Sequence, residues 1–203
     1  LKIIRRRMRE MARRKTITRD QILTAAHQVI SEKGFSHFTA RNIATQMNCS
    51  TQPIYLEFKN MNDLKEELFN VMADQFSDDF LKESEMKDPF TELGMRFILF
   101  AKKNQQLYQS LYIEDVEGAQ KMQAAFKKVF FTLLEKAGEA INETKESFFL
   151  AYFIYVSGLA AMENEKILSF EMEDLRTMLT TFLQSVREGK NAGATLFTLG
   201  NFA

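Results

Sequence analysis

Apolar residues recur three or four positions apart along most of the chain, which is the spacing of one face of an α-helix. Gly and Pro together account for only 10 of the 203 residues, and this scarcity disfavours all-β folds, which turn every 8–12 residues. We therefore predict an all-α protein of about nine helices. Beyond the first sixty residues the pattern predicts helices over residues 61–85, 90–108, 109–115, 119–141, 145–166 and 171–188. Gly118, the 138–142 region and Ser169 mark the breaks.

The first sixty residues contain helix-capping patterns at short intervals. Thr18 and Gln21 form a capping-box pattern ahead of the first helix, and Gly34 is placed to end that helix as a left-handed residue. Thr39 is a suitable N-cap for a short helix over 40–47. Ser50 is expected to cap a third helix that begins at residue 51, and Asn60 to cap a fourth.

The second and third of these helices are separated by three residues, which is the helix-turn-helix pattern. If Ile54 and Phe58 face inward, Thr51, Gln52, Tyr55 and Lys59 must face outward. A Gln side chain can pair with adenine and a Thr methyl group can contact thymine, whereas Tyr and Lys can reach phosphates. The simpler alternative is a helical hairpin with no DNA-binding role.

Charge favours the DNA-binding interpretation. The chain is neutral as a whole, but residues 1–60 hold 12 Lys/Arg and 4 Asp/Glu, whereas residues 61–203 hold 15 and 23. Basic residues begin at Arg5 and continue through Arg14 and Lys15. Because the first residue is Leu1, Met11 is a candidate natural start, with residues 1–10 upstream of it. The asymmetry predicts a polyanion-binding module joined to an acidic one.

A resemblance to the DNA-binding signature of TetR-type transcriptional regulators runs from Thr39 to Leu64 (TARNIATQMNCSTQPIYLEFKNMNDL). With the first helix it covers residues 18–68. The resemblance implies three DNA-binding helices followed by about six helices that form a dimer and a ligand pocket. The predicted DNA-binding residues are Arg14, Lys15, Thr39, Arg41, Ser50, Thr51, Gln52, Pro53, Tyr55 and Lys59.

This sequence departs from the family pattern at three places. Asn48-Cys49 replaces the usual Gly and Val-like pair in the turn, and Asn tolerates the left-handed conformation needed there. Met61 stands where the family often has a phosphate-binding Lys, a role that Lys59 is placed to take. Pro53 removes a backbone donor from the third helix.

The second module is rich in Phe, Tyr and Met on helical stripes. The resemblance implies an effector chamber among the helices spanning 61–166, and packing within an ordinary core is the alternative. Because no cluster of charges is expected inside, an apolar or aromatic small molecule is the expected effector. The candidate effector-binding residues are Phe76, Phe97, Phe100, Phe126, Tyr152 and Tyr155.

The last two helices carry stripes that suggest a homodimer interface built as a four-helix bundle. Small and apolar residues recur on the first of these helices, and a longer apolar stripe runs along the second. Packing inside one chain is the alternative. The predicted interface residues are Ala151, Ile154, Gly158, Ala161, Leu175, Leu179, Phe182 and Val186.

Enzyme chemistry finds no support in the sequence. The chain has no Gly-rich phosphate loop, no nucleophile elbow and no HExxH motif. Its single cysteine, Cys49, and two histidines, His27 and His37, stand at no metal-ligand spacing, so no metal or cofactor is predicted. No apolar stretch reaches the roughly 20 residues of a membrane span, no signal peptide is visible, and a cytoplasmic location is expected.

Together these patterns predict a sequence-specific DNA-binding regulator, most simply a ligand-released repressor that binds a palindromic operator as a dimer. The alternative is a DNA-binding regulator that senses no small molecule and whose second module serves dimerisation or protein partners. The predicted division is a basic arm over 1–17, a helix-turn-helix domain over 18–60, an effector-binding and dimerisation domain over 61–189 and a tail over 190–203.

Overall fold

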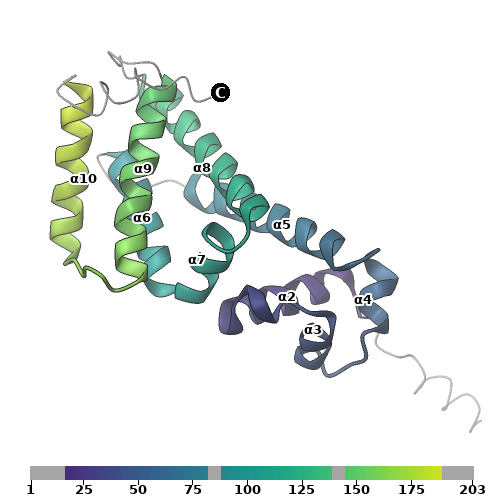
Figure 1. Cartoon of the computed structure of the whole chain (residues 1–203). Helices are drawn as coiled ribbons and strands as arrows, with labels where there is room; N and C mark the ends of the chain where they lie inside the picture. Colours follow the sequence, from purple (N-terminus) through teal and green to yellow (C-terminus); the bar gives the residue numbers. More distant parts are fainter. Residues whose placement is uncertain (1–16, 82–87, 139–144, 189–203) are drawn as a thin grey trace, which may run out of the picture. The chain divides into compact units, whose positions relative to one another are not determined.

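The computed structural model describes residues 17–81, 88–138 and 145–188, and the secondary structure in these ranges is helical throughout (Figure 1). The all-α prediction is therefore confirmed. Arg14, Lys15 and the predicted tail over 190–203 lie outside the described residues. The α-helices in this part of the chain are α2 (Arg19–Lys33), α3 (Ala40–Gln46), α4 (Gln52–Glu57), α5 (Met61–Leu81), α6 (Pro89–Lys103), α7 (Gln105–Tyr112), α8 (Val116–Ala137), α9 (Lys145–Asn164) and α10 (Met172–Arg187), with a 3-10 turn, η1 (Phe35–His37).

Backbone contacts divide the chain into two compact units, with the division between Leu68 and Phe69 inside α5. In the first unit, α2 begins with the predicted capping box, since Thr18 Oγ1 accepts from Gln21 N and Gln21 Oε1 accepts from Thr18 N. Thr39 caps α3 through Asn42 N, at 3.2 Å. These caps pair backbone donors that a helix start otherwise leaves unpaired.

Two predictions about the ends of these helices need correction. Ser50 does not cap the third helix, because α4 begins at Gln52 with Thr51 as its N-cap residue, and no side chain caps it. Gly34 does have a positive φ of 81°, but its ψ of 173° places it outside the left-handed helical region. Only glycine adopts this backbone conformation readily, so Gly34 is required by the turn into η1.

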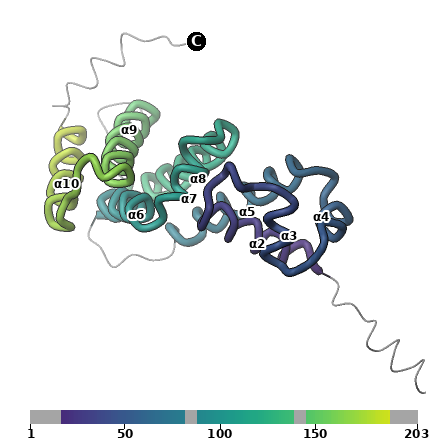
Figure 2. Tube along the Cα trace, turned by 60° about the horizontal axis from the view of Figure 1, so that its bottom comes forward, coloured from purple at the N-terminus to yellow at the C-terminus, as the bar shows by residue number. Residues whose placement is uncertain are grey.

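The second unit is built on α6, which packs against both α9 and α10 (Figures 1 and 2). Aromatic rings are frequent in its core, where eight of the 21 buried residues are Phe or Tyr. Phe130 contacts the rings of Phe90, Phe148 and Tyr152 at centroid distances of 5.0–5.2 Å. Burying such large apolar surfaces is the main source of stability available to this unit.

Two predicted boundaries in the second unit were wrong. The helix expected over 90–108 is interrupted at Asn104, where α6 ends and α7 begins, because the Asn104 side chain donates to the Phe100 carbonyl at 3.1 Å. Such local side-chain bonds compete with helix propagation. Gly118 does not break a helix but lies in the first turn of α8, where a Cβ atom would lie 2.6 Å from Phe69 Cε2. Glycine is needed there for close packing.

Buried polar side chains tie the end of α9 to the α6–α7 junction. The Glu163 carboxylate accepts from Phe170 N at 2.6 Å and pairs with Lys102 Nζ at 3.1 Å. Asn164 Nδ2 donates to the Ala101 carbonyl at 2.9 Å. The Glu163 charge and the Asn164 amide N–H are thereby paired on burial, which would otherwise cost several kcal/mol in an apolar interior.

Candidate DNA-binding surface

The turn between α3 and α4 has the conformation that the sequence required. Asn48 adopts φ 52°, as the left-handed interpretation of the Asn48-Cys49 turn predicted. Cys49 N donates to the Ala44 carbonyl at 3.0 Å, which closes the end of α3. Cys49 is a free, half-buried thiol. The turn therefore fixes how α4 follows α3.

Packing sets the orientation of α4 within the first unit. Ile54 is 0% exposed and Phe58 is 1% exposed, so one side of α4 faces the core as predicted. The Arg19 guanidinium lies over the Phe58 ring, 4.1 Å from its centroid, and donates to the Glu57 carbonyl at 2.8 Å. These contacts hold the end of α4 against α2.

The opposite side of α4 faces solvent. Gln52, Tyr55 and Lys59 are exposed, and Thr51 and Pro53 are half-buried. Asn60 Oδ1 accepts from Asp63 N and Asp63 Oδ2 accepts from Lys59 N, both at 2.9 Å, so the backbone at Lys59 is fixed by the cap of α5. The helix thus presents an amide and a phenol outward, and the residue after its C-cap adds an ammonium group.

The remaining predicted DNA-binding residues lie around α3 and its turn. Arg41 and Ser50 are exposed, and the Thr39 hydroxyl is already used in capping α3. Most of the positive charge lies elsewhere, because residues 1–16 hold eight Lys/Arg against one Asp/Glu, whereas residues 17–60 hold four against three. The basic excess thus belongs to the arm rather than to the helix-turn-helix itself.

Leu56 was not among the predicted residues, and its side chain is 76% exposed on α4. The signal was available in the spacing, because successive residues of an α-helix are about 100° apart and Leu56 is two positions from the buried Ile54. It therefore lies on the side opposite the core.

Four of the predicted effector residues lie in one aromatic cluster of the second unit. Phe126 is the common member, with ring centroids 6.0 Å from Phe76, 5.1 Å from Phe97 and 6.0 Å from Tyr152. The other two predicted effector residues, Tyr155 and Phe100, lie elsewhere in the second unit. Tyr155 stacks on Phe182 at 4.2 Å, between α9 and α10, and Phe100 is half-buried on α6.

Tyr112 was not among the predicted effector residues, but it lies beside this cluster and its hydroxyl group is unusual. Its ring lies 5.2 Å from that of Phe97 and 5.1 Å from that of Tyr108. Its hydroxyl is buried and has no hydrogen-bond partner, whereas the Tyr152 hydroxyl donates to the Phe90 carbonyl. Burial, with a smaller contribution from Tyr108, raises the pKa of Tyr112 well above its usual value, so the group is a neutral donor.

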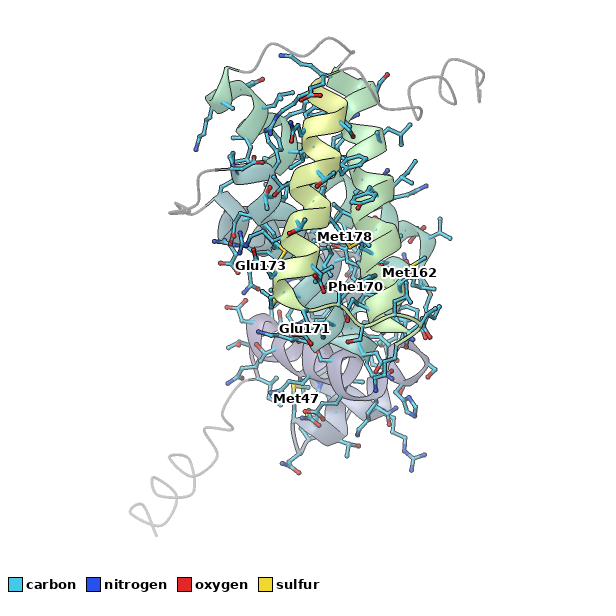
Figure 3. All side chains as sticks on the ribbon, turned by 90° about the vertical axis from the view of Figure 1, so that its left-hand side faces the viewer. Met47, Met162, Phe170, Glu171, Glu173 and Met178 are labelled. Carbon is cyan, nitrogen blue, oxygen red and sulfur yellow. The ribbon has the colours of Figure 1, made fainter. Side chains whose placement is uncertain are left out.

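The predicted dimer stripes fall into two groups. On α9, Ile154 is 51% exposed and a Cβ atom added at Gly158 would meet open space, while Ala151 and Ala161 are half-buried. Leu150 and Met162 extend this exposed stripe in both directions. Figure 3 views this side of the second unit, with Met162 on α9 and Met178 on α10 labelled.

On α10 the prediction needs correction. Leu175, Leu179 and Val186 are at most 1% exposed and belong to the core of their own chain. The reason is that α10 packs on α6, where Gly94 leaves room for the Leu179 side chain. For these three residues the alternative of packing inside one chain is correct, and Phe182 alone of the α10 set is half-buried against Tyr155.

The described part of the chain contains no candidate metal site and no candidate membrane-spanning helix. No group of three or more His, Cys, Asp or Glu side chains there could hold a metal ion. No described helix is both long and apolar enough to cross a bilayer.

Two short helices, α3 and α4, with polar side chains exposed on the second, have the arrangement of a helix-turn-helix DNA-binding motif, although residues 47–51 separate them and not the three residues predicted. Residues 22–68 match the family model of bacterial regulatory proteins of the tetR family. The chain thus carries the DNA-binding domain of TetR-family transcriptional regulators, in residues 22–68. Because this is a family of regulators, the prediction that the chain is not an enzyme is confirmed.

Solved structures of similar fold cover most of the chain. FadR from Bacillus subtilis, in complex with stearoyl-CoA, has a TM-score of 0.58 and 20% identity, over 85% of this chain and 99% of its own. The fatty acid degradation regulator FadR from Bacillus halodurans has a TM-score of 0.58 and 19% identity, over 85% and 99%. A protein described as a TetR-family regulator from Rhodococcus sp. has a TM-score of 0.59 and 19% identity, over 83% and 98%. No curated protein sequence matches the chain.

Proposed function

We propose that this regulator is a repressor that binds a palindromic operator as a homodimer and is released by an apolar small molecule. The observation that carries the operator-binding part is the outward face of α4, where Gln52 and Tyr55 are exposed on a helix whose other side is fixed in the core, with Lys59 exposed just after its end. Side chains with this geometry can enter a major groove and reach both base edges and phosphates.

The first experiment measures operator binding by fluorescence anisotropy on duplexes selected from fragments upstream of the protein's own gene. Gln52→Ala and Tyr55→Ala should each weaken binding at least tenfold, about 1.4 kcal/mol, because each removes a groove or phosphate contact. Thr24→Ala is the matched control, since Thr24 is exposed on α2 and its hydroxyl bonds only its own helix. Unchanged affinity in both α4 variants would overturn the assignment of this surface.

We assign Arg14 and Lys15 to phosphate binding, together with the other basic residues of the arm. The support is the charge of residues 1–16, eight Lys/Arg against one Asp/Glu. Removing these residues should weaken binding to selected and unselected duplexes alike and flatten the dependence of affinity on salt, because phosphate contacts release counterions and read no sequence. An unaltered salt dependence would contradict this role.

The effector site is proposed in the aromatic cluster that Phe126 forms with Phe76, Phe97 and Tyr152, whereas Phe100 and Tyr155 are candidate residues outside this cluster. A guest with a long apolar chain is the first choice, because the rings offer apolar surface and a protein of the same fold, FadR from B. subtilis, was solved with stearoyl-CoA. The unpaired Tyr112 hydroxyl would then donate to an uncharged oxygen of the guest.

Titration of the protein–operator complex tests the effector, with stearoyl-CoA and free stearic acid as the probes. Release at micromolar concentration is expected for one of them. Tyr112→Phe should weaken that effect about three- to tenfold without loss of folding, because it removes one hydrogen bond and no packing. Tyr108→Phe, which leaves the ring stack in place, is the control. Equal responses of the two variants would exclude the Tyr112 contact.

The homodimer is proposed to form through the exposed stripe of α9 and the adjoining edge of α10. Its support is the run of Ile154, Gly158 and Ala161, with Phe182 next to it. Ile154→Glu should shift the sedimentation coefficient to that of a monomer, because an unpaired charge would be buried at the interface. Ile113→Glu, at a residue 63% exposed, is the matched control.

One observation favours a regulator that senses no small molecule. Phe97, Phe126 and Tyr152 are each 0% exposed, and the Tyr152 hydroxyl already has its partner inside the chain. An interior closed in this way needs no guest. If neither probe, nor a wider panel of apolar compounds, releases DNA while the dimer persists, this second function replaces the first.

A further inference from the structure

Leu56 is the most exposed large apolar side chain of the protein's described residues, at 76%, and it lies on the helix that carries the DNA-binding surface. An exposed leucine alone needs no explanation, since much of any protein surface is apolar. Its position on α4 is what distinguishes it.

The direction of Leu56 follows from the buried face of α4. Ile54 is 0% exposed and therefore marks the inward direction. At about 100° per residue, Gln52 and Leu56 both lie roughly 160° from Ile54, and Tyr55 lies at about 100°. Gln52 and Leu56 are thus one turn apart on the outermost ridge of α4, the part that would enter a groove most deeply.

The chemistry of the major groove offers one apolar group at base edges, the C5-methyl group of thymine. A leucine on the outermost ridge matches this group, whereas it has nothing to bond to a phosphate, an amine or a carbonyl. We propose that Leu56 reads a thymine methyl group in each operator half-site. The proposal rests on operator binding through α4, and it adds a specificity-determining residue to that surface.

The spacing along α4 predicts where this thymine lies. Gln52 and Leu56 are four residues apart, which is about 6 Å along a helix, and base pairs are about 3.4 Å apart. The thymine should therefore lie about two base pairs from the base that Gln52 contacts. Polar side chains on both sides of Leu56 would fix its register.

The test compares thymine with deoxyuridine, which differs only in lacking the methyl group. The wild-type protein first selects its preferred duplex from a random pool, and each thymine of one half-site is then replaced singly by deoxyuridine. One replacement should weaken wild-type binding about three- to fivefold, as expected for the loss of one buried methyl contact. For the Leu56→Ala variant, the same replacement should change the affinity for the duplex less than 1.5-fold. This corresponds to about 0.2 kcal/mol of binding free energy.

Two further variants keep this result interpretable. Leu56→Met retains an apolar side chain and should retain part of the thymine preference, whereas Ile113→Ala, at another exposed aliphatic residue, should respond to deoxyuridine as the wild type does. Thermal unfolding of Leu56→Ala should match the wild type, because so exposed a side chain contributes little to the core.

The outcomes separate this inference from the function on which it rests. If the protein selects a duplex but deoxyuridine weakens wild type and Leu56→Ala equally, another residue reads the methyl group and the inference is overturned. If no thymine in the half-site is sensitive, it is overturned as well. If no duplex is selected at all, sequence-specific operator binding itself fails, and the inference fails with it.

Discussion

The two units of this protein are stabilised by different kinds of side chain. In the first unit the core is mainly aliphatic, and Phe58 is the one buried aromatic residue among the described positions up to Leu68. In the second unit eight of the 21 buried core residues are aromatic, among them Phe90, Phe130 and Tyr152. An aliphatic side chain buries a small apolar area and contributes little to stability on its own, whereas each aromatic ring buries a large area and contributes more. We therefore expect the units to differ in how they respond to single truncations.

The largest effect is expected from Phe130→Ala. Phe130 is 0% exposed and its ring contacts Phe90, Phe148, Phe149 and Tyr152, so truncation should lower the free energy of unfolding by about 3–5 kcal/mol. Urea unfolding followed by circular dichroism measures it. Phe131→Ala, at the half-buried neighbour, should cost clearly less. Equal losses would show that the ring cluster is not the centre of this unit.

A smaller effect is expected from Gly94→Ala on α6. An added Cβ would lie 2.9 Å from Leu179 Cδ2 and 3.0 Å from the Tyr152 hydroxyl. Both neighbours are buried and cannot move away freely, so the variant should lose about 1–3 kcal/mol despite the better helix propensity of alanine. Gly158→Ala is the control, because a Cβ there meets nothing within 4 Å in its own chain, and both variants are compared in the Ile154→Glu background so that the proposed dimer does not contribute. A stabilised Gly94→Ala would place Leu179 outside the core.

In the first unit a helix cap gives a still smaller effect. Thr39→Ala removes the oxygen that accepts from Asn42 N and should cost about 1 kcal/mol, with a proportionate loss of DNA affinity if α3 frays. Hydrogen exchange of the α3 amides locates the loss. Thr45→Ala serves as the control, because its hydroxyl bonds the Arg41 carbonyl within α3 and caps nothing. Exchange that rises equally in both would argue against a capping role.

The smallest effect is a pH dependence in the first unit. Burial lowers the pKa of His27 from its usual value of 6.5, so the neutral form is favoured in the folded state. The resulting stability is complete above pH 6.5 and is lost as the pH falls through the lower pKa, because the unfolded chain then binds a proton first. The melting temperature of His27→Gln should fall less between pH 7.5 and 5 than that of the wild type. His37→Gln, at an exposed position, should follow the wild type.

The sequence was most informative where one residue decides the local structure. Thr18, Thr39 and Asn60 cap helices because their side chains can accept from a backbone N–H three residues on, and that requirement is readable without a fold. The inward face of α4 was predictable for a similar reason, since Ile54 and Phe58 are one turn apart.

The sequence-based predictions were wrong where the role of a residue depends on a neighbour that is distant in sequence. The role of Gly118 depends on the ring of Phe69, which is distant in sequence, and the buried stripe of α10 depends on the room left by Gly94. An apolar stripe looks the same whether it faces its own chain or a partner, so Leu175, Leu179 and Val186 could not be assigned from spacing alone. The unpaired Tyr112 hydroxyl is likewise a property of the folded core, and no pattern marks it.

The contact between Glu163 and the Phe170 amide has a consequence for protein engineering. The turn joining α9 to α10 is pinned at both ends, because the carboxylate of one end accepts from the backbone of the other at 2.6 Å. A reporter inserted between these residues, or a deletion that shortens the turn, would take the Phe170 amide away from the buried Glu163 carboxylate and leave it with Lys102 alone. Although the tip of this turn is exposed, the turn is therefore a poor site for fusion or for circular permutation.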